Sequence, residues 1–411
     1  MNVILILYAI SDVYQLESYA RIKQHIQPYF YIPHYTLLSG DFLNPLPYTA
    51  FDSGRTVIKA LNLLPVDIVT FGNHDIEDNT KVLNEVLDED LNTVYISTNI
   101  KGIEKSIPYH IIQEKNLKLG IIGLCDDTFY TKSKIEFYDK NVVVRNNIEI
   151  LMKNNVDYII ALTHNDPEVD YALIDKFPEI DLILSGHIHE YSYLNYKNVP
   201  IIRTGENVET LAEISFHEDK SFSVDFTDIS NVKQHVSYNK LISDGKEMLK
   251  SFEGVSIFYL KQNYNLENLR NRQNLFMKKL CELVKSYFNS DFGIINAGLF
   301  RLKRKEIEIV FSYSDFNLAF PFDNPFMKFS ISGKLLNSAI EYANKRHYNQ
   351  GGFIHRTDGF IENDREYTIA LNGLIIDGMD ENPFFEQLKP ININEGISIR
   401  SILLEFRNLE I

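Results

Sequence analysis

The sequence predicts a layered α/β domain followed by a second domain. Apolar runs with strand character alternate with helical stretches from residue 1 to about residue 190, which is typical of α/β layers. Three more strand-like runs follow without helices between them. A polar segment then precedes a part of the chain that opens with a strand and a long amphipathic helix, so we expect two domains.

Composition narrows the class of protein. The chain has 411 residues with 45% hydrophobic and 12% aromatic content, which is enough for two sizeable cores. Its net charge of -15 disfavours a nucleic-acid partner, because holding a phosphate backbone requires a basic surface. The only cysteines, Cys125 and Cys281, fall in different expected domains and suit a reducing compartment, so we expect a cytoplasmic protein.

The first apolar run, Val3 to Ile10, resembles a strand more than a targeting or membrane segment. It has no basic flank and no small-residue cleavage site. No other apolar run approaches the roughly 20 residues that a membrane-spanning helix needs. The sequence therefore predicts no membrane partner and no signal peptide, although a signal removed beforehand would leave no trace here.

The elements of the first domain follow from hydrophobic pattern and turn residues. Helices are expected at Ser53–Leu64, where Asp52 or Ser53 can cap and Pro65 stops the helix, and at Asn79–Leu87. The expected strands are Val3–Ser11, Tyr35–Gly40, Asp67–Phe71, Thr93–Thr98, Leu117–Leu124, Asp157–Thr163 and Asp181–Ser185. An antiparallel finish is expected from Pro200–Gly205, Leu211–His217 and Ser221–Asp228.

The polar stretch from Ile229 to Gly254 is the best candidate for a connection between domains. We place the boundaries at 1–235 for the first domain, 236–254 for the linker and 255–411 for the second domain. In the second domain, an amphipathic helix over Glu267–Phe288 is expected to bury Leu269, Phe276, Leu280, Leu283, Val284 and Tyr287. Its other expected elements are a strand at Val255–Leu260, a helix at Gly333–Ala343, and strands at Tyr367–Leu371 and Ile397–Phe406.

Five polar clusters stand at the ends of predicted strands. They are Ser11-Asp12-Val13-Tyr14, Ser39-Gly40-Asp41, Gly72-Asn73-His74-Asp75, Thr163-His164-Asn165-Asp166 and Ser185-Gly186-His187-Ile188-His189. Because the carboxyl ends of parallel strands meet at one edge of a sheet, we expect these clusters to converge. Taken alone, Asp12 or Asp41 after a strand is more often a turn or cap residue, and His164 alone is more often an ordinary hydrogen-bonded histidine. Together they offer the donors that divalent first-row metals prefer, and Asp41 is suited to bridge two ions about 3.5–4 Å apart.

In order, these clusters resemble the signature of the calcineurin-like metallophosphoesterases: D-x-H, G-D, G-N-H-[DE], a lone His and G-H-x-H. The segment from Ala60 to Asp67 that leads into the third cluster is similar to the 5'-nucleotidase branch of that family. The likeness continues in the second domain, in Asn296-Ala297-Gly298-Leu299-Phe300-Arg301, Ala319-Phe320-Pro321-Phe322-Asp323-Asn324 and Gly351-Gly352-Phe353. It therefore covers nearly the whole chain.

The resemblance implies a layered β-sandwich flanked by helices, with a dinuclear site for Mn, Zn, Fe or Co and an α+β substrate-binding domain. It makes Asp12, Asp41 and His189 ligands of one ion, and Asp41, Asn73, His164 and His187 ligands of the other. His74 would be the catalytic acid or electrostatic stabiliser, oriented by Glu77. The implied activity is nucleotide catabolism, in which a metal-bridging hydroxide releases phosphate from a small-molecule nucleotide.

The resemblance also suggests how the second domain binds substrate. Arg301, in the same motif as Asn296, would hold phosphate, and Phe353 would stack on the base. A structural ion pair for Arg301 and core packing for Phe353 are the alternatives. The last family motif is altered in this chain, so a second stacking residue is Phe384, Phe385 or absent.

The first cluster departs from the family pattern, because Tyr14 stands where a histidine ligand is expected. A neutral phenol binds divalent metals poorly, since its pKa near 10 keeps the proton on. The outcomes that we weigh are a weakened metal site, a water in the gap, a changed metal preference, or Tyr14 itself as a ligand. The alternative functions are a phosphoesterase acting on a non-standard nucleotide or another phosphoester, and a degenerate nucleotide-binding homologue without turnover. The sequence does not assign an oligomeric state.

Overall fold

In the computed structural model the chain forms two compact units, Met1–Glu247 and Met248–Ile411. Among the residues described, no helix combines the length and the apolar character that crossing a bilayer requires. The described residues are 2–29, 31–43, 52–64, 66–76, 80–90, 92–125, 135–253, 256–260, 262–302, 304–307, 310–320, 325–345, 353–372, 383–385, 388, 390–391 and 397–405.

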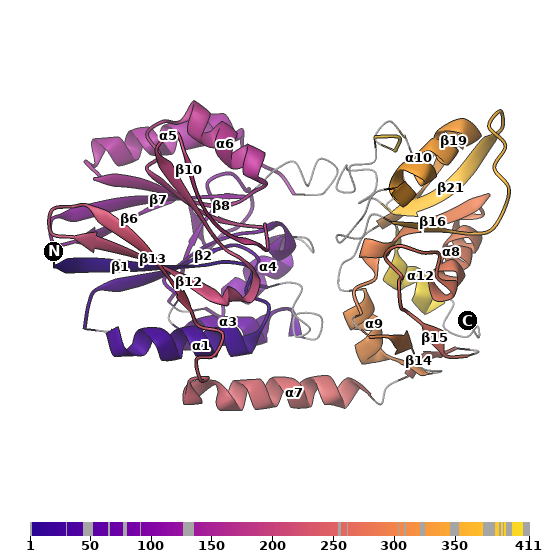
Figure 1. Ribbon diagram of the computed structural model, residues 1–411, viewed down its shortest axis with the longest axis horizontal. Helices are drawn as coiled ribbons and strands as arrows, with labels where there is room; N and C mark the ends of the chain where they lie inside the picture. Colours follow the sequence, from indigo (N-terminus) through magenta and orange to yellow (C-terminus); the bar gives the residue numbers. More distant parts are fainter. Residues whose placement is uncertain are drawn as a thin grey trace. The chain divides into compact units, whose positions relative to one another are not determined.

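The N-terminal unit is built on two β-sheets (Figure 1). The first has the strand order β13-β12-β1-β2-β3-β4-β5, and the second has the order β10-β11-β9-β8-β7-β6. The first sheet consists of β1 (Val3–Ile10), β2 (His34–Ser39), β3 (Ile68–Thr70), β4 (Val94–Ile96), β5 (Ser106–Ile107), β12 (Thr210–His217) and β13 (Phe222–Asp228). The second consists of β6 (Tyr109–Glu114), β7 (Leu117–Cys125), β8 (Tyr158–His164), β9 (Leu182–Gly186), β10 (Tyr191–Tyr196) and β11 (Val199–Thr204).

One hydrophobic core joins the two sheets, and helices cover their outer faces. Leu5 and Leu7 of β1 share this core with Leu119 and Ile121 of β7. The outer face of the second sheet packs on α5 (Lys140–Lys153) and α6 (Pro167–Lys176). In Figure 1, α1 (Leu16–Ile26) and α3 (Arg55–Leu63) lie on the side of the first sheet. This arrangement confirms the predicted helix-flanked β-sandwich.

The predicted elements of the first 190 residues are present. Each of the seven expected strands forms, with ends that agree within two residues. The two expected helices are α3 and α4 (Thr80–Leu87). At the start of α3 the Asp52 carboxylate accepts the N–H groups of Gly54 and Thr56, at 3.0 and 2.8 Å, so the predicted acid does stabilise this helix end.

The expected antiparallel finish is wrong for its first strand. β11 pairs in parallel with β9 and antiparallel with β10, and so belongs to the second sheet. β12 and β13 pair antiparallel in the first sheet, where β12 also lies antiparallel to β1. β10 was not predicted, because its residues are largely exposed and carry no apolar alternation. Which of the two sheets β11 joins depends on tertiary contacts, and a local sequence pattern carries no information on those contacts.

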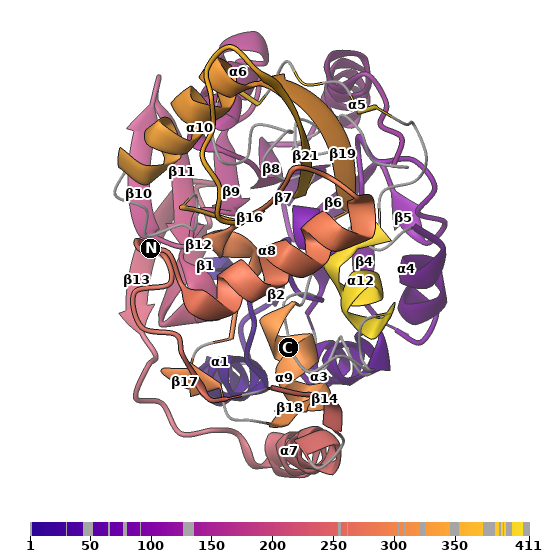
Figure 2. The ribbon, with the colours of Figure 1, turned by 90° about the vertical axis from the view of Figure 1, so that its right-hand side faces the viewer.

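The C-terminal unit contains a five-stranded sheet with the order β20-β16-β21-β19-β22. The helix α8 (Leu275–Phe288) covers one face, where Ile295 and Ala370 join its core, and α10 (Gly333–Lys345) covers the face that carries Ile294 and Ile369. Figure 2 shows α8 lying across this sheet with α12 (Ile399–Glu405) beside it. The sheet strands are β16 (Phe292–Asn296), β19 (Pro325–Ser332), β20 (Ile354–Arg356), β21 (Glu366–Asn372) and β22 (Ile397–Ser398). Smaller elements are β14 (Ser256–Tyr259), β15 (Tyr264–Asn265), β17 (Glu306–Ile307), β18 (Val310–Ser312) and α9 (Tyr313–Ala319).

Two predictions for this unit are wrong, one on where a helix starts and one on the type of an element. α8 begins at Leu275 and not at Glu267, because the Asn274 side chain accepts the N–H groups of Phe276 and Met277 and caps the helix there. The segment expected as a strand over Ile397–Phe406 is strand only at Ile397–Ser398 and continues as α12. The buried residues of α12, namely Ile399, Ile402 and Leu403, follow helical spacing.

The segment expected to connect the domains is largely helical. α7 spans Asn239–Glu253, and the division between the two compact units falls within it. The predicted domain boundaries at residues 235 and 255 stay predictions.

Candidate metal centre

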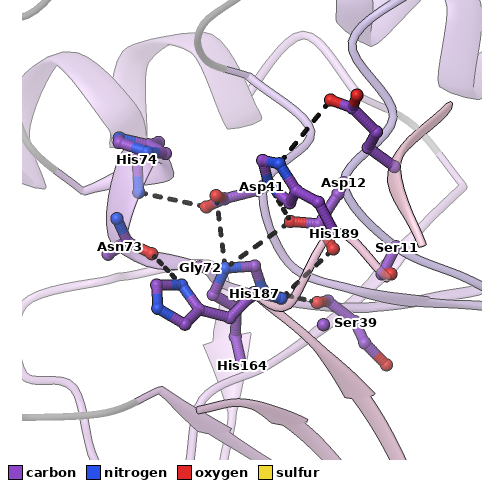
Figure 3. Close-up of polar contacts among 12 residues, drawn as sticks. Ser11, Asp12, Ser39, Asp41, Gly72, Asn73, His74, His164, His187 and His189 are labelled. Carbon is purple, nitrogen blue, oxygen red and sulfur yellow. Dashed lines mark hydrogen bonds and ion pairs between the residues drawn. The ribbon is translucent and has the colours of Figure 1, made fainter. Parts of the chain in front are cut away.

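The five polar clusters come together in space, from two sheets and not from the edge of one. β1, β2 and β3 run parallel in the first sheet, and β8 and β9 run parallel in the second. The side chains that follow these strands meet in one group (Figure 3). Convergence was predicted correctly, but the expectation of a single sheet was wrong, because the sandwich places the carboxyl ends of both sheets together.

Unusual backbone geometry allows this approach. Asp12, Asp41 and His187 have positive φ angles of 52°, 55° and 78°, in the region that side-chain-bearing residues rarely adopt. A Cβ on Gly40 would lie 2.5 Å from His164 Nδ1, and one on Gly72 would lie 2.0 Å from Asp41 Oδ1. The glycines of the G-D and G-N-H motifs are therefore required by the closeness of the ligands.

Asp75 holds two of the loops together. Its carboxylate accepts the backbone N–H groups of Gly72 and Asp41 at 2.8 Å, of Phe42 at 3.0 Å and of Leu43 at 2.8 Å. Burial, with the nearby charge of Asp41, raises the pKa of Asp75 to about 7 against these amides. Sequence reasoning gave Asp75 no role. The sequence feature that could have indicated a role is the position of this carboxylate, directly after the predicted site residues Asn73 and His74.

Asp12, Asp41 and His164 form a buried group whose donor atoms lie within 4.8 Å of one another. His164 Nε2 lies 3.2 Å from Asp41 Oδ2 and 3.9 Å from Asp12 Oδ1. Donors that share one ion at about 2.0–2.2 Å lie roughly 3 Å apart, so these distances fit a divalent ion. The Nδ1 of His164 hydrogen-bonds the carbonyl of Ser39 at 2.8 Å, which orients Nε2 toward the carboxylates.

The electrostatics of this group favour a cation. Burial lowers the pKa of His164, but the carboxylates of Asp41 and Asp12 outweigh burial and raise it to about 10. Burial raises the pKa of Asp41, and His164 outweighs burial and holds that pKa well below its usual range. Two buried carboxylates thus attract positive charge, which a divalent ion would supply in place of a proton.

A second set of donors lies beside this group. His187 Nδ1 lies 3.1 Å from Asn73 Oδ1, and His187 Nε2 lies 3.5 Å from a carboxylate oxygen of Asp166. Burial and the nearby His164 lower the pKa of His187 to about 4, so its ring is neutral at pH 7, as metal ligation requires. Sequence reasoning assigned no role to Asp166, although the residue belongs to one of the five clusters.

Tyr14 and His189 complete the group on the side of Asp12. The Tyr14 hydroxyl lies 3.2 Å from Asp12 Oδ1, 3.2 Å from Asp41 Oδ2 and 3.1 Å from His189 Nε2. Burial, and then the charges of Asp41 and Asp12, raise the pKa of Tyr14 well above 10, so it is a neutral phenol. His189 Nδ1 lies 3.6 Å from Glu206 Oε2, a neighbour that no sequence pattern indicated.

Of the two predicted catalytic residues, His74 and Glu77, the structure describes only His74. The backbone N–H of His74 donates to Asp41 Oδ1 at 3.0 Å, and Figure 3 shows the His74 ring beside the group of acidic and histidine side chains. Glu77 lies outside the described residues. The proposed orientation of His74 by Glu77 therefore stays a prediction.

The predicted substrate residues all lie in the C-terminal unit. Arg301 lines a cavity of about 330 Å³ together with Arg270 and Arg304. Asn296 is buried and accepts a hydrogen bond from Asn372 Nδ2 at 3.1 Å. Arg304 also forms an ion pair with Asp315. Guanidinium groups in the lining suit an anionic group.

The two residues predicted to stack on the base, Phe353 and Phe384, differ in their exposure. Phe353 is only 7% exposed and packs within the core beneath α8, with its ring edge-on to His355, which favours the alternative of core packing. Phe384 packs edge-on to Tyr342 at 5.8 Å and is partly exposed. The contacts of both rings are with other side chains, so base stacking by Phe353 or Phe384 stays a prediction.

Comparison with known proteins assigns the family of the N-terminal unit. Residues 6–191 match the family of calcineurin-like phosphoesterases, which use divalent metal ions. This match confirms the resemblance inferred from the five clusters. Over 369 residues the chain is 24% identical to the snake venom 5'-nucleotidase of Crotalus adamanteus, an alignment that covers 76% of this chain and 62% of that relative. The chain thus spans less than two thirds of the length of this relative.

Solved structures share the fold over nearly the whole chain. A candidate 5'-nucleotidase of Staphylococcus aureus superposes with a TM-score of 0.78 at 15% identity, covering 98% of this chain and 96% of the other. The 5'-nucleotidase precursor of Thermus thermophilus superposes with a TM-score of 0.72 at 14% identity, with the same coverage of 98% and 96%. At these identities the likeness shows the fold, and it confirms the predicted fold class.

Proposed function

Because residues 6–191 form a calcineurin-like phosphoesterase domain, we propose that this protein is a divalent-metal-dependent phosphohydrolase that releases phosphate from nucleotides. The observation that carries the proposal is the convergence of Asp12, Asp41 and His164 into one buried group of donors. Asn73, His187 and His189 extend this group. Buried carboxylates without a cation are costly, so the arrangement is best explained by metal binding.

The residues of the centre would have distinct roles in the proposed reaction. A bound divalent ion supplies a Lewis acid that polarises a phosphoryl oxygen and lowers the pKa of water. Asp41 and His164 would hold the ion, and the Ser39 carbonyl keeps His164 in the orientation that ligation needs. His74 would donate a hydrogen bond to the phosphoryl or leaving oxygen, with its backbone fixed by Asp41.

The substrate class rests on charge and on the relatives. The cavity lined by Arg270, Arg301 and Arg304 supports an anionic ligand. The names of the relatives supply the choice of nucleotides. A net charge of -15 supports a small molecule over a nucleic acid. Two buried cysteines that form no disulfide, Cys125 and Cys281, support a cytoplasmic location.

The test is phosphate release from a panel of nucleotides with Mn²⁺, Zn²⁺ or Co²⁺, alongside elemental analysis of the purified protein. We expect metal to co-purify and at least one nucleotide to be hydrolysed. Asp41→Asn should abolish both metal binding and turnover, and His74→Asn should lower turnover while leaving metal content unchanged. Full activity in both variants would show that the proposed site is wrong.

Tyr14 favours a second candidate function, a nucleotide-binding homologue without turnover. Its neutral phenol stands where a histidine ligand is expected and is a poor donor to divalent metals, which favours an incomplete dinuclear centre. The same assay separates the two candidates. Saturable nucleotide binding by calorimetry, with no phosphate released from any substrate in any metal, would support this alternative.

A further inference from the structure

We propose that Asp170 is a positioning residue of the metal centre, because it holds the two strand ends that carry His164 and His187 in the geometry that metal binding requires. This role rests on the proposed function, since Asp170 acts through two predicted ligands of the same centre. Asp170 lies in α6 and does not belong to the predicted ligand set.

The Asp170 carboxylate joins α6 to three neighbouring strands of the second sheet. The side chain is fully buried, and its Oδ1 accepts the Asn165 side-chain N–H at 3.1 Å. Its Oδ2 accepts the Ser185 hydroxyl at 2.7 Å and a guanidinium N–H of Arg203 at 2.9 Å. Asn165 directly follows β8, Ser185 lies in β9 and Arg203 lies in β11. One carboxylate therefore fixes the ends of three strands against one helix.

These hydrogen bonds act on the face of the sheet opposite to the metal centre. Side chains alternate between the two faces along a strand. Ile183 of β9 packs in the core beneath α6, and Ser185, two positions later, shares its face. Leu162 of β8 packs in the core between the sheets, and His164 shares that face, where its Nδ1 contacts the Ser39 carbonyl. The strand ends are thus held from behind while the ligands face the centre.

Both hydrogen-bonded residues stand next to a predicted ligand in the sequence. Asn165 follows His164 directly, and Ser185 stands two positions before His187. The two strand ends are also in register, since His164 pairs with Gly186. Because metal–ligand distances tolerate a deviation of only about 0.2 Å, a small shift of either strand end would weaken binding.

Stability alone does not explain the ion pair between Asp170 and Arg203. Their side chains are 0% and 2% exposed, in a core that is otherwise lined by apolar residues such as Leu173 and Ile201. Burial raises the pKa of Asp170, although the hydrogen bond from Ser185 and the charge of Arg203 act to lower it. Apolar residues of similar volume often stabilise a core at least as well as a buried ion pair does. Holding the ligand-bearing strand ends gives the pair a purpose that apolar packing would not serve.

The first test is Ser185→Ala, which removes one of the three hydrogen bonds and leaves the ion pair in place. The Mn²⁺ affinity of the folded protein should fall about 10-fold, at the low end of the loss expected when a residue that orients a metal ligand is changed. Isothermal titration of the whole chain with Mn²⁺ measures this affinity. Wild-type affinity in Ser185→Ala would overturn the positioning role.

Thr93→Val is the matched control, because it also removes one buried hydroxyl hydrogen bond. The Thr93 hydroxyl donates to the Val66 carbonyl at 3.1 Å, and both residues precede their strands, at the end of the first sheet away from the metal centre. Thr93→Val should lower stability in urea unfolding about as much as Ser185→Ala does, and it should keep wild-type Mn²⁺ affinity. An equal loss of affinity in both variants would show that affinity follows general stability, and would overturn the role of Asp170.

A double variant separates the geometry of the centre from the stability of the ion pair. Asp170→Asn alone would leave the charge of Arg203 buried without its partner, which is strongly destabilising. Asp170→Asn combined with Arg203→Met removes both charges at similar volume, so the protein should fold with a melting temperature near that of wild type. An amide has one oxygen to accept hydrogen bonds where the carboxylate has two, so Mn²⁺ affinity should fall about 10- to 100-fold.

The outcomes for wild type and variants distinguish the two proposals. A folded double variant with wild-type Mn²⁺ affinity would overturn the positioning role and leave the proposed function intact. Wild-type protein that binds no Mn²⁺, Zn²⁺ or Co²⁺ would instead remove the proposed function, and the role of Asp170 with it.

Discussion

At the scale of single residues, glycines decide how closely the metal ligands approach. A Cβ at Gly72 would overlap Asp41 Oδ1 at 2.0 Å, although the backbone angles at Gly72, φ -99° and ψ 175°, are open to any residue. The requirement for glycine is therefore steric and specific to the centre. A substitution here should displace a ligand without straining the backbone.

Gly72→Ala should weaken metal binding by about 10- to 100-fold, the loss expected when the surroundings of a metal ligand are disturbed. Isothermal titration with Mn²⁺ measures this change. Gly120→Ala is the matched control, because its Cβ would meet only the Leu151 side chain, at 2.8 Å, in the core beneath α5. It should lower stability and leave metal affinity unchanged. Wild-type affinity in Gly72→Ala would show that Asp41 is not a ligand.

Asp67 is a partly buried carboxylate in the loop before β3. Its carboxylate accepts the N–H of Thr36 at 2.7 Å. Burial nevertheless raises the pKa of Asp67 from 3.8 to about 6, against that hydrogen bond. The folded state therefore holds this proton more tightly than the unfolded state does. Stability from this group is fully present below pH 4 and is lost as the pH rises to about 6.

Asp67→Asn removes this pH dependence and keeps an acceptor for Thr36. Relative to the variant, wild type should lose roughly 2 kcal/mol of unfolding free energy between pH 4 and pH 7. Urea unfolding of both proteins across that range measures the difference. A constant difference between the two proteins at every pH would contradict the raised pKa.

At the scale of elements, side-chain caps decide where helices start. The hydrophobic pattern extends α8 back to Glu267, because Leu269 is buried and falls at helical spacing. Asn274 starts the helix at Leu275, since its side chain accepts two backbone N–H groups and also donates to the Asn265 carbonyl. Hydrophobic periodicity reports burial, and it does not distinguish a helix from a packed turn.

Asn274→Ala should destabilise the C-terminal unit by about 1 kcal/mol, the usual cost of losing an N-cap. Asn274→Ser restores the acceptor but not the donor to Asn265, so it should recover part of the loss. Thermal unfolding followed by circular dichroism measures both. Equal stability of the alanine and serine variants would contradict a capping role.

At the scale of the whole molecule, each unit has its own core and one buried thiol. Cys125 ends β7 in the N-terminal unit, and Cys281 lies in α8 of the C-terminal unit. Neither cysteine forms a disulfide. Because each is released only when its surroundings open, labelling of the two cysteines reports on the two units separately.

Saturation with Mn²⁺ should slow the labelling of Cys125 and leave that of Cys281 unchanged. An ion at 100 times its dissociation constant stabilises a folded unit by about 2.7 kcal/mol, which corresponds to roughly 100-fold slower labelling. Mass spectrometry after timed alkylation follows both sites, with chelator-treated protein as the reference. Equal slowing at both cysteines would show that the two units open together.

Much of the N-terminal unit was predictable because its strands are apolar throughout and end in polar donors. The Asp12, Asp41, Asn73, His164, His187 and His189 positions follow from that pattern together with the family resemblance. The roles of Asp75 and Glu206 were not predictable. Asp75 binds amides of another loop, and Glu206 meets His189 only after the chain returns through β11.

By itself, the sequence determined the strands of the first 190 residues, the family of the N-terminal domain and the candidate ligands, because these depend on residue type and order along one stretch of chain. Only the tertiary structure decided that the ligands come from two sheets and that β11 joins the second. It alone placed the Tyr14 hydroxyl between Asp12, Asp41 and His189. Tyr14 and His189 are separated by 175 positions, and contacts across such distances depend on how the sheets pack and not on any local pattern.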